Sequence, residues 1–317
     1  MDISKWLAHF VYFIFYSLGF IVYLLPFKIK YILAKFWAFI WFYIIKIRVK
    51  VQLHNLTIAF PKNKHETISQ YKNRIYKLAK ENLVHTVLAL YEILQSAHWK
   101  LSDVEKQAKI IGLEYHDSNK GVFYLVSHIG CFEMSGKITS LSGMKGAFLA
   151  RRARSKFFEI IIKKFRLNLG HEVIAERGTY QLIQQYIKDK RSVAFMFDQH
   201  LGEPIGTDSK FFDQKVMSAK GLATLSEKLS TPIHPMSYYR SKKGIYEVTI
   251  HPAIDFQFED KYCAKTNKLR DEYLYYHTSK CNEIIEGWVR ENPTQYFWLH
   301  RRFKLTHNYR ELLPWQK

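Results

Sequence analysis

Short apolar segments alternate with segments of helical periodicity through most of the chain, and this alternation restricts the fold more than any other feature. In the helical segments apolar residues recur at three- and four-residue steps, whereas the apolar segments are short and bounded by turn-forming residues. Strands are expected at residues 121–127, 146–150, 172–175, 192–197, 232–238 and 246–251, and helices at 67–95, 133–141, 155–168, 178–190, 217–229 and 270–291. Alternation of this kind predicts the α/β class, with a largely parallel or mixed sheet flanked by helices.

Polar side chains follow three of the predicted strands at the point where each strand ends. His128 follows the strand at 121–127, Arg151 and Arg152 follow the strand at 146–150, and Asp198 and Gln199 follow the strand at 192–197. Binding sites of open α/β sheets form at the carboxyl ends of strands, so we expect these groups to gather at one edge. Other interpretations stay open: Asp198 can cap a turn or helix, and the arginines can form a solvated basic surface.

His128 and Glu133 form a His-x4-Glu pattern between the first of these strands and the following helix. Side chains five residues apart on a straight helix point about 140° away from each other, so the pair can meet only where the chain turns. Gly130 can supply that turn. A histidine base with an anionic partner suits the attack of a hydroxyl on an acyl thioester, because imidazole titrates near neutrality and a carboxylate stabilises the imidazolium. The alternative is an ordinary surface pair.

The N-terminal segment from Trp6 to Phe27 contains no Asp, Glu, Lys or Arg. About twenty helical residues span roughly 30 Å, the thickness of the hydrocarbon core of a bilayer. No small-residue cleavage site follows, which favours an uncleaved anchor over a signal peptide. Cations follow at Lys28, Lys30, Lys35, Lys46, Arg48 and Lys50, and no acid occurs between residues 3 and 65. Positively charged flanks stay in the cytoplasm, so we expect the catalytic part to face the cytoplasm.

The aromatic segment from Tyr31 to Ile45 is interrupted by Lys35 and is short for a membrane span, so we interpret it as a helix in the membrane interface. A buried helix of the soluble part is the alternative. The predicted organisation is a transmembrane anchor at residues 1–27, a basic aromatic interfacial segment at 28–50 and one catalytic domain at 51–317.

The charge of the chain favours an anionic membrane surface as a partner. The formal net charge is +20 and aromatic residues make up 16% of the chain, a combination that suits phosphate headgroups. Nucleic acid would attract the same charge, but no zinc finger, helix-turn-helix or aromatic strand motif accompanies it. The cysteines Cys131, Cys263 and Cys281 lack CxxC spacing and a framework count, which indicates a reducing compartment.

Several segments carry motifs of a known family. They are Asn55-Leu56 with Phe60-Pro61, Gly112-Leu-Glu114, the block from His128 to Glu133, Asp198-Gln199, Lys210-Phe-Phe212 and the block from Pro293 to Lys304. In these segments the chain resembles the lipid A biosynthesis acyltransferases, late acyltransferases of the bacterial lysophospholipid acyltransferase superfamily. Two departures occur: Gly130-Cys-Phe-Glu133 stands where the family has Gly-Asn-Trp-Glu, and Phe211-Phe-Asp213 stands where it has Phe-Phe-Gly. Neither departure removes His128 or Glu133.

The resemblance implies a glycerolipid acyltransferase-like fold, a bacterial inner membrane location, and a reaction without metal, cofactor or covalent enzyme intermediate. The implied acyl donor is an acyl-acyl carrier protein, and the acceptor is a hydroxyl of a lipid A precursor. His128 would act as general base while Glu133 holds its imidazole. Arg151 or Arg152 would bind phosphate, since a guanidinium matches phosphate oxygens bidentately. Asp198, together with Gln199, would orient the acceptor or an arginine.

The block from Gln295 to Lys304 combines an aromatic residue, Trp298, with the cations Arg301 and Arg302, and we expect it to contact the phosphate-rich membrane surface. The alternative is a structural closing segment that its aromatic residues tie to the core. Cys131 could act as an acyl-accepting thiol, but the family has Asn at this position, so we interpret Cys131 as a pocket or packing residue.

Two alternatives to this function stay open. One is an acyltransferase that uses acyl-CoA or acyl carrier protein and acts on another glycolipid or on a lysophospholipid. The other is a membrane lipid-binding protein that has lost catalysis. The presence of both His128 and Glu133 argues against the second.

Overall fold

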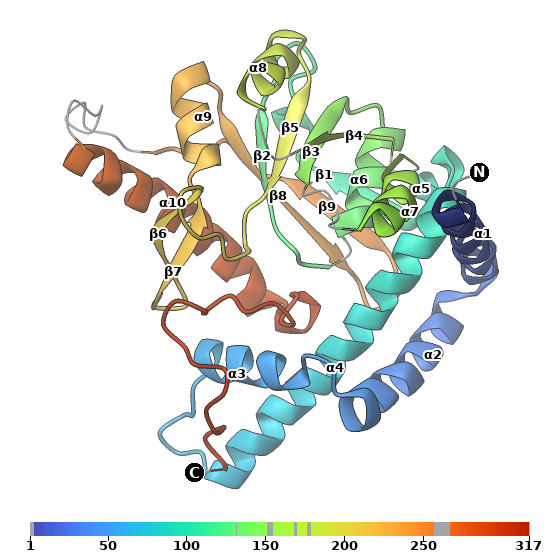
Figure 1. Ribbon diagram of the computed structural model, residues 1–317, viewed down its shortest axis with the longest axis vertical. Coiled ribbons are helices and arrows are strands. Elements are labelled where there is room, and N and C mark those ends of the chain that lie inside the picture. The colour runs from blue at the N-terminus through green and yellow to red at the C-terminus, as the bar shows by residue number, and fades with distance from the viewer. Residues whose placement is uncertain are drawn as a thin grey trace. The chain divides into compact units, whose positions relative to one another are not determined.

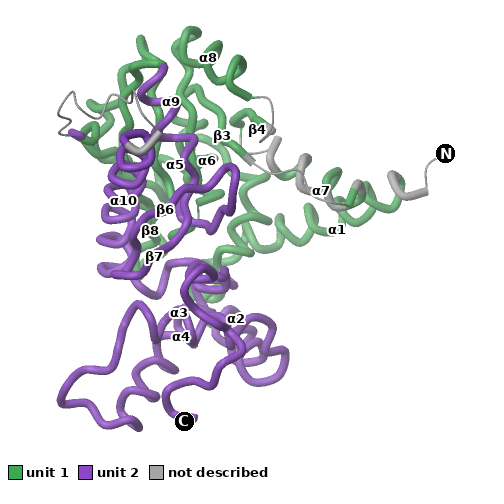
Figure 2. Tube along the Cα trace, turned by 60° about the vertical axis from the view of Figure 1, so that its left-hand side comes forward, with its two compact units in different colours: residues 1–32, 88–196, 229–254 green, residues 33–87, 197–228, 255–317 purple. Residues whose placement is uncertain are grey.

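The computed structural model describes residues 3–130, 132–150, 155–167, 170–175, 179–256 and 267–316. The chain forms two compact units, shown in Figure 2. Unit 1 comprises Met1–Ile32, Leu88–Met196 and Leu229–Ile254, and unit 2 comprises Leu33–Val87, Phe197–Lys228 and Asp255–Lys317. This division follows packing and does not coincide with the functional boundaries predicted after residues 27 and 50, so those boundaries stay a prediction.

Unit 1 is built on a seven-stranded sheet with the order β1-β9-β8-β2-β5-β3-β4. The strands are β1 Ala108–Ile111, β2 Phe123–Val126, β3 Gly146–Ala150, β4 Glu172–Ala175, β5 Ser192–Met196, β8 Ile233–Arg240 and β9 Tyr246–Ile250. Neighbouring strands are parallel except β8 and β9, which are antiparallel (Figure 1). The predicted α/β class with a largely parallel sheet is confirmed.

Helices connect the central parallel strands. α6 Phe132–Leu141 joins β2 to β3, α7 Lys156–Leu167 joins β3 to β4, and α8 Tyr180–Lys188 joins β4 to β5. α5 Leu101–Gln107 and the short 3-10 helices Ser96–His98 and Leu113–Tyr115 precede β2 in the chain. Every residue of β2 is buried, which explains its unbroken apolar sequence. β2 is thus a core strand, and the residues after it leave the sheet at its carboxyl edge.

α1 Ile3–Leu24 packs on unit 1 along one side, and lies beside α7 in Figure 1. The docked side carries Tyr12, Tyr16, Gly19 and Tyr23, which recur at three- and four-residue steps. The Tyr12 ring lies edge-on to Phe165, and His98 donates to the Tyr16 carbonyl at 2.9 Å. A Cβ at Gly19 would touch the Leu94 carbonyl. The Tyr23 hydroxyl donates to Asp103 at 3.1 Å. The other sides expose large apolar side chains such as Trp6, Phe13 and Ile21.

Among the described residues, α1 contains the one helical stretch long and apolar enough to cross a membrane, Trp6–Leu24, with a mean hydropathy of 1.9. The helix ends three residues before the predicted Phe27, because Pro26 cannot continue it. The contacts described above bind one side of this helix to a folded unit, so α1 is not a free-standing helix.

The segment predicted as an interfacial helix is helical. Its residues lie in α2 Phe27–Ile40 and in the π-helix Trp41–Ile45, which follows α2 directly. Large apolar side chains of this segment are exposed, among them Ile32, Phe36, Trp37, Phe39 and Ile44. Such exposure does not fit the alternative of a buried helix.

Unit 2 contains α3 Val49–Ala59, α10 Asn267–Glu291, and an antiparallel hairpin of β6 Gly206–Phe211 and β7 Gln214–Ala219, followed by α9 Gly221–Leu229. The helix predicted at 217–229 was wrong in its first four residues, because α9 begins at Gly221. Met217, Ser218 and Ala219 pair with Asp208, Thr207 and Gly206 of β6. Pairing with a neighbouring strand outweighs a local helical pattern.

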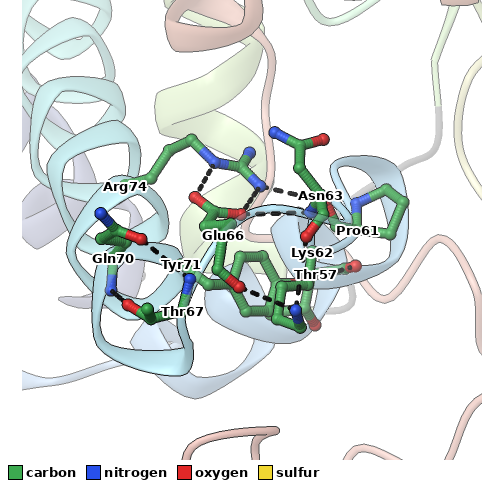
Figure 3. A network of polar contacts seen from close by, with 9 residues as sticks. All are labelled: Thr57, Pro61, Lys62, Asn63, Glu66, Thr67, Gln70, Tyr71 and Arg74. Carbon is green, nitrogen blue, oxygen red and sulfur yellow. Dashed lines mark hydrogen bonds and ion pairs between the residues drawn. The ribbon is translucent and has the colours of Figure 1, made fainter.

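α4 Ile68–Gln95 begins in unit 2 with a network of polar contacts (Figure 3). Thr67 and Gln70 form a reciprocal cap, in which each side chain accepts a hydrogen bond from the other's backbone N–H, at 3.2 and 2.8 Å. Arg74 donates to both carboxylate oxygens of Glu66, at 2.8 and 2.9 Å, and to the Pro61 carbonyl at 3.0 Å. The loop that carries the Phe60-Pro61 motif is therefore tied to the start of α4.

Candidate functional site

His128 lies just beyond the carboxyl end of β2, in the segment that leads to α6. The hydrophobic run of β2 places the backbone in the core, and the chain emerges two residues later with a half-buried imidazole. The imidazole packs edge-to-face on Phe132, with ring centroids 4.8 Å apart. The imidazole therefore packs against an apolar ring and is still partly accessible, which suits proton transfer between His128 and a bound substrate.

Gly130 provides the turn that the sequence predicted between His128 and Glu133. Its φ of +60° lies in the left-handed region, and a Cβ at this position would lie 2.5 Å from the carbonyl oxygen of Tyr238. Glu133 follows in the first turn of α6 and is half-buried. A carboxylate is favoured there by the partial positive charge of the helix N-terminus. The pairing of the two side chains stays a prediction.

The strands that precede the three predicted polar groups are neighbours in the sheet. β5 lies between β2 and β3, and Val126 of β2 is in register with Met196 of β5. Arg151 and Arg152 follow β3 directly but lie outside the described residues, as does Cys131. Asp198 and Gln199 follow β5 in the chain and belong to unit 2. Gathering of the three groups at one edge therefore stays a prediction.

Asp198 is buried within unit 2, with 2% of its surface exposed. The hydroxyl of Tyr296 donates to the Asp198 carbonyl at 3.4 Å. Burial, and then the neighbouring charge of Asp198, raises the pKa of Tyr296 well above its ordinary value. Arg302 donates to the Gln199 carbonyl at 3.1 Å. These contacts tie the segment after β5 to Tyr296 and Arg302. The Gln199 side chain is half-buried, and the role of Asp198 in orienting the acceptor or an arginine stays a prediction.

Trp298 and Arg302 are 0% and 1% exposed, so the prediction that they contact the membrane surface was wrong. The Trp298 indole N–H donates to the Pro293 carbonyl at 2.7 Å. The Arg302 guanidinium donates to the carbonyls of Gln199 and Met217, to the Ser218 hydroxyl and to the Asn282 side-chain carbonyl, at 2.8 to 3.1 Å. Burial lowers the pKa of Arg302. For these two residues the alternative of a closing segment holds, whereas Arg301 is exposed.

A family profile described as bacterial lipid A biosynthesis acyltransferase matches residues 2–305. The chain belongs to this family. A lipid A biosynthesis acyltransferase of Haemophilus influenzae is 24% identical over 265 residues, which cover 81% of this chain and 78% of that protein. A lipid A biosynthesis palmitoleoyltransferase of Escherichia coli K12 is 24% identical over 266 residues, covering 82% and 80%. The predicted family and the predicted acyltransferase activity are thus confirmed.

The chain is also similar to the crystal structure of a 1-acyl-sn-glycerophosphate acyltransferase from Thermotoga maritima. That similarity covers 85% of this chain and 99% of that chain, at 13% identity and a TM-score of 0.35.

Two residues for which the sequence predicted no role hold candidate segments in place. Asn55 donates to the carbonyls of Trp298 and His300, at 2.7 and 2.6 Å, and accepts from the Tyr309 hydroxyl at 2.6 Å. Tyr238 donates to the Ser127 carbonyl at 2.6 Å. The Asn55-Leu56 motif was a signal for Asn55. No spacing pattern could have found Tyr238, because its partner lies 111 positions away.

Proposed function

We propose that this protein transfers a fatty acyl chain from an acyl-acyl carrier protein to a hydroxyl of a lipid A precursor, with His128 as general base. The position of His128 carries the proposal. The imidazole is half-buried at the end of a fully buried core strand, followed by a left-handed turn at Gly130 and by Glu133 in the first turn of α6. The matched relatives are named lipid A biosynthesis acyltransferases, which supports the acceptor class.

In the proposed reaction His128 accepts the proton of the acceptor hydroxyl while that oxygen attacks the thioester carbonyl carbon. The tetrahedral intermediate collapses, the carbon–sulfur bond breaks, and the imidazolium returns the proton to the departing sulfur. The products are an acyloxyacyl ester and the free thiol of the carrier protein. Glu133 holds the imidazole and stabilises its charged form during the step. Arg151 or Arg152 binds a phosphate of the acceptor or of the donor arm.

The proposed location is the cytoplasmic face of the bacterial inner membrane. α1 and α2 carry the exposed apolar side chains that enter the bilayer, and the cations that follow α1 meet anionic headgroups. The contacts of α1 with unit 1 change the predicted transmembrane anchor into a helix that lies along the domain. A helix that keeps Tyr12 to Tyr23 on the domain runs about 16 Å along it. A crossing orientation would carry the contact residues His98 and Asp103 toward hydrocarbon, which is unfavourable for Asp.

The test is an assay with the purified, detergent-solubilised protein, an acyl-acyl carrier protein and a lipid A precursor in mixed micelles. Release of free thiol and the mass of the lipid product are followed together. The wild-type protein is expected to release thiol only when the acceptor is present and to add one acyl chain to it. His128→Ala is expected to lose roughly 10²- to 10⁴-fold in rate, the range typical of a general base.

His65→Ala is the matched control, because His65 is an exposed histidine on the loop before α4. Its activity is expected to equal that of the wild type. Normal turnover by folded His128→Ala protein would refute the mechanism. Failure of the wild type to acylate a lipid A precursor, together with transfer from acyl-CoA to a lysophospholipid, would refute the proposed substrates. Absence of thiol release with every donor and acceptor would favour a lipid-binding protein.

A further inference from the structure

Tyr238 reaches from β8 to the peptide group that carries His128. β8 is the parallel neighbour of β2, and their paired register runs from Phe123 with Ile233 to Leu125 with Pro235. Beyond that register the Tyr238 hydroxyl donates to the Ser127 carbonyl at 2.6 Å. The Ser127 carbonyl and the His128 N–H belong to one planar peptide group. The hydrogen bond therefore fixes the plane from which the His128 side chain starts.

The same residue also limits the chain on the far side of His128. The Tyr238 carbonyl oxygen would lie 2.5 Å from any Cβ at position 130, so the turn at Gly130 packs directly on the Tyr238 backbone. Tyr238 thus contacts the chain on both sides of His128: its hydroxyl contacts Ser127, and its main chain contacts Gly130.

The end of β8 that bears Tyr238 is itself held firmly. Arg240 forms a bidentate ion pair with Glu92 of α4, and their side chains are 1% and 3% exposed. The Tyr246 hydroxyl donates a further hydrogen bond to Glu92 at 2.8 Å. A buried ion pair with additional hydrogen bonds resists displacement, since separating it leaves uncompensated charge in the core. Tyr238 therefore has a fixed base from which to hold the His128 segment.

We infer that Tyr238 is a positioning residue for His128. This inference rests on the proposed role of His128 as general base. Tyr238 and Ser127 are both buried, with 4% and 0% exposure, so water cannot replace the hydroxyl without a rearrangement. Loss of the hydroxyl leaves the Ser127 carbonyl unpaired and allows the peptide plane before His128 to rotate. Small misplacements of a catalytic group reduce rates strongly, up to about 10²-fold for about 1 Å.

The substitution Tyr238→Phe removes only the hydroxyl. We expect kcat to fall about tenfold, with KM within about twofold of the wild type, because the inference gives Tyr238 no contact with either substrate. Tyr186→Phe is the matched control. Tyr186 is also a buried tyrosine of unit 1, and its hydroxyl donates to Glu172, far along the chain from the His128 segment. Its kcat is expected to stay within about twofold of the wild type.

The decisive measurement combines Tyr238→Phe with His128→Ala. If Tyr238 acts through His128, the second substitution has little further effect on the residual rate of His128→Ala protein, within about twofold. A general loss of folded enzyme would instead lower both rates by the same factor. Equal factors in the two backgrounds, or a Tyr186→Phe loss as large as that of Tyr238→Phe, would overturn the inference. A Tyr238→Phe enzyme with wild-type kcat would overturn it as well.

The outcome is separable from that of the proposed function. Full activity of His128→Ala alone would refute the general base and leave no group for Tyr238 to position. A large His128→Ala loss combined with a normal Tyr238→Phe enzyme refutes only the positioning role.

Discussion

At the scale of single residues, the conformation of Gly130 is the feature that most directly controls the candidate site. Its φ is +60° and its space is limited by the Tyr238 carbonyl. Gly130→Ala is expected to strain the backbone, by roughly 1–2 kcal/mol for the left-handed conformation, and to push the turn away from β8. We expect at least about a tenfold loss of kcat, because the displaced segment carries His128.

Gly143→Ala separates the strain from the steric clash. Gly143 also has a positive φ, of +87°, but no atom lies within 4 Å of a Cβ built there. Gly143→Ala carries only the backbone strain, so it should lose stability in thermal unfolding without losing activity in the thiol-release assay. Gly130→Ala carries the clash as well and should lose both. If both retain wild-type kcat, the position of His128 does not depend on the packing of this turn.

The sequence led to the correct place for His128 because an apolar run followed by a polar residue marks the end of a buried strand. It failed for Trp298 and Arg302, whose residue types suit a membrane surface equally well. Burial of Arg302 depends on acceptors at positions 199, 217, 218 and 282, which only the tertiary structure brings to it. A composition pattern contains no information about such partners.

At the scale of elements, Arg302 ties the C-terminal segment to the segment after β5, to β7 and to α10. Arg302→Met removes four hydrogen bonds, and it removes a buried positive charge that the charge of Asp198 stabilises. We expect a loss of about 3–5 kcal/mol in the free energy of unfolding. The free energy of unfolding is measured by urea denaturation of the protein in detergent, followed by fluorescence.

Arg301→Met is the adjacent control, since Arg301 is exposed and its substitution should change stability by about 0.5 kcal/mol or less. Equal stability of the two variants would show that the buried network around Arg302 contributes nothing net. Urea midpoints must be compared at one detergent concentration, because detergent that binds the native state raises apparent stability.

The strands β2, β3, β4, β5, β8 and β9 were predicted from the sequence, whereas β1, β6 and β7 were missed. The sequence of β6 is Gly-Thr-Asp-Ser-Lys-Phe. Its Ser209 is buried, and the Ser209 hydroxyl forms hydrogen bonds with Ser218 and Asn282 at 2.9 and 3.1 Å. No hydrophobic alternation marks such a strand. β1 has four residues and pairs with β9, from Ala108 with Tyr246 onward. Pairing over so long a distance in the chain leaves no local signal.

At the scale of the whole molecule, the attachment to the membrane should depend on the exposed sides of α1. Phe13 and Ile21 are exposed, whereas the docked side of the helix contacts unit 1. The double substitution Phe13→Glu and Ile21→Glu is expected to move protein from the membrane fraction to the soluble fraction, because charged groups in the apolar region are unfavourable. Leu312→Glu is the control, since Leu312 is exposed near the C-terminus.

Reporters fused to either end of the chain test the orientation of α1. Contacts of Tyr12 to Tyr23 with unit 1 predict that both ends lie on the cytoplasmic side. An N-terminal reporter found outside the cytoplasm, with the C-terminal one inside, would show that α1 leaves unit 1 and crosses the bilayer. The transmembrane anchor predicted from the sequence at residues 1–27 would then hold.

The net charge of +20 predicts how the acyl donor is captured. Acyl carrier proteins are acidic, so the attraction acts over distances comparable with the Debye length, which falls from about 10 Å at 0.1 M salt to about 3 Å at 1 M. Contacts with a buried acyl chain are little screened. Added salt should therefore raise the apparent KM for acyl-acyl carrier protein at least about tenfold over this range, while kcat changes by less than about twofold.

Acyl-pantetheine is the matched donor for this measurement, because it presents the same thioester without a charged carrier. Its KM should be higher at low salt and nearly independent of salt. The lipid A precursor is also anionic, so its surface concentration in the micelles must be held fixed and saturating while only the donor varies. An equal salt response of the two donors would argue against a docking surface for an acidic carrier protein. Equal turnover and an equal salt response with acyl-CoA would favour the alternative donor, because one surface would then serve both.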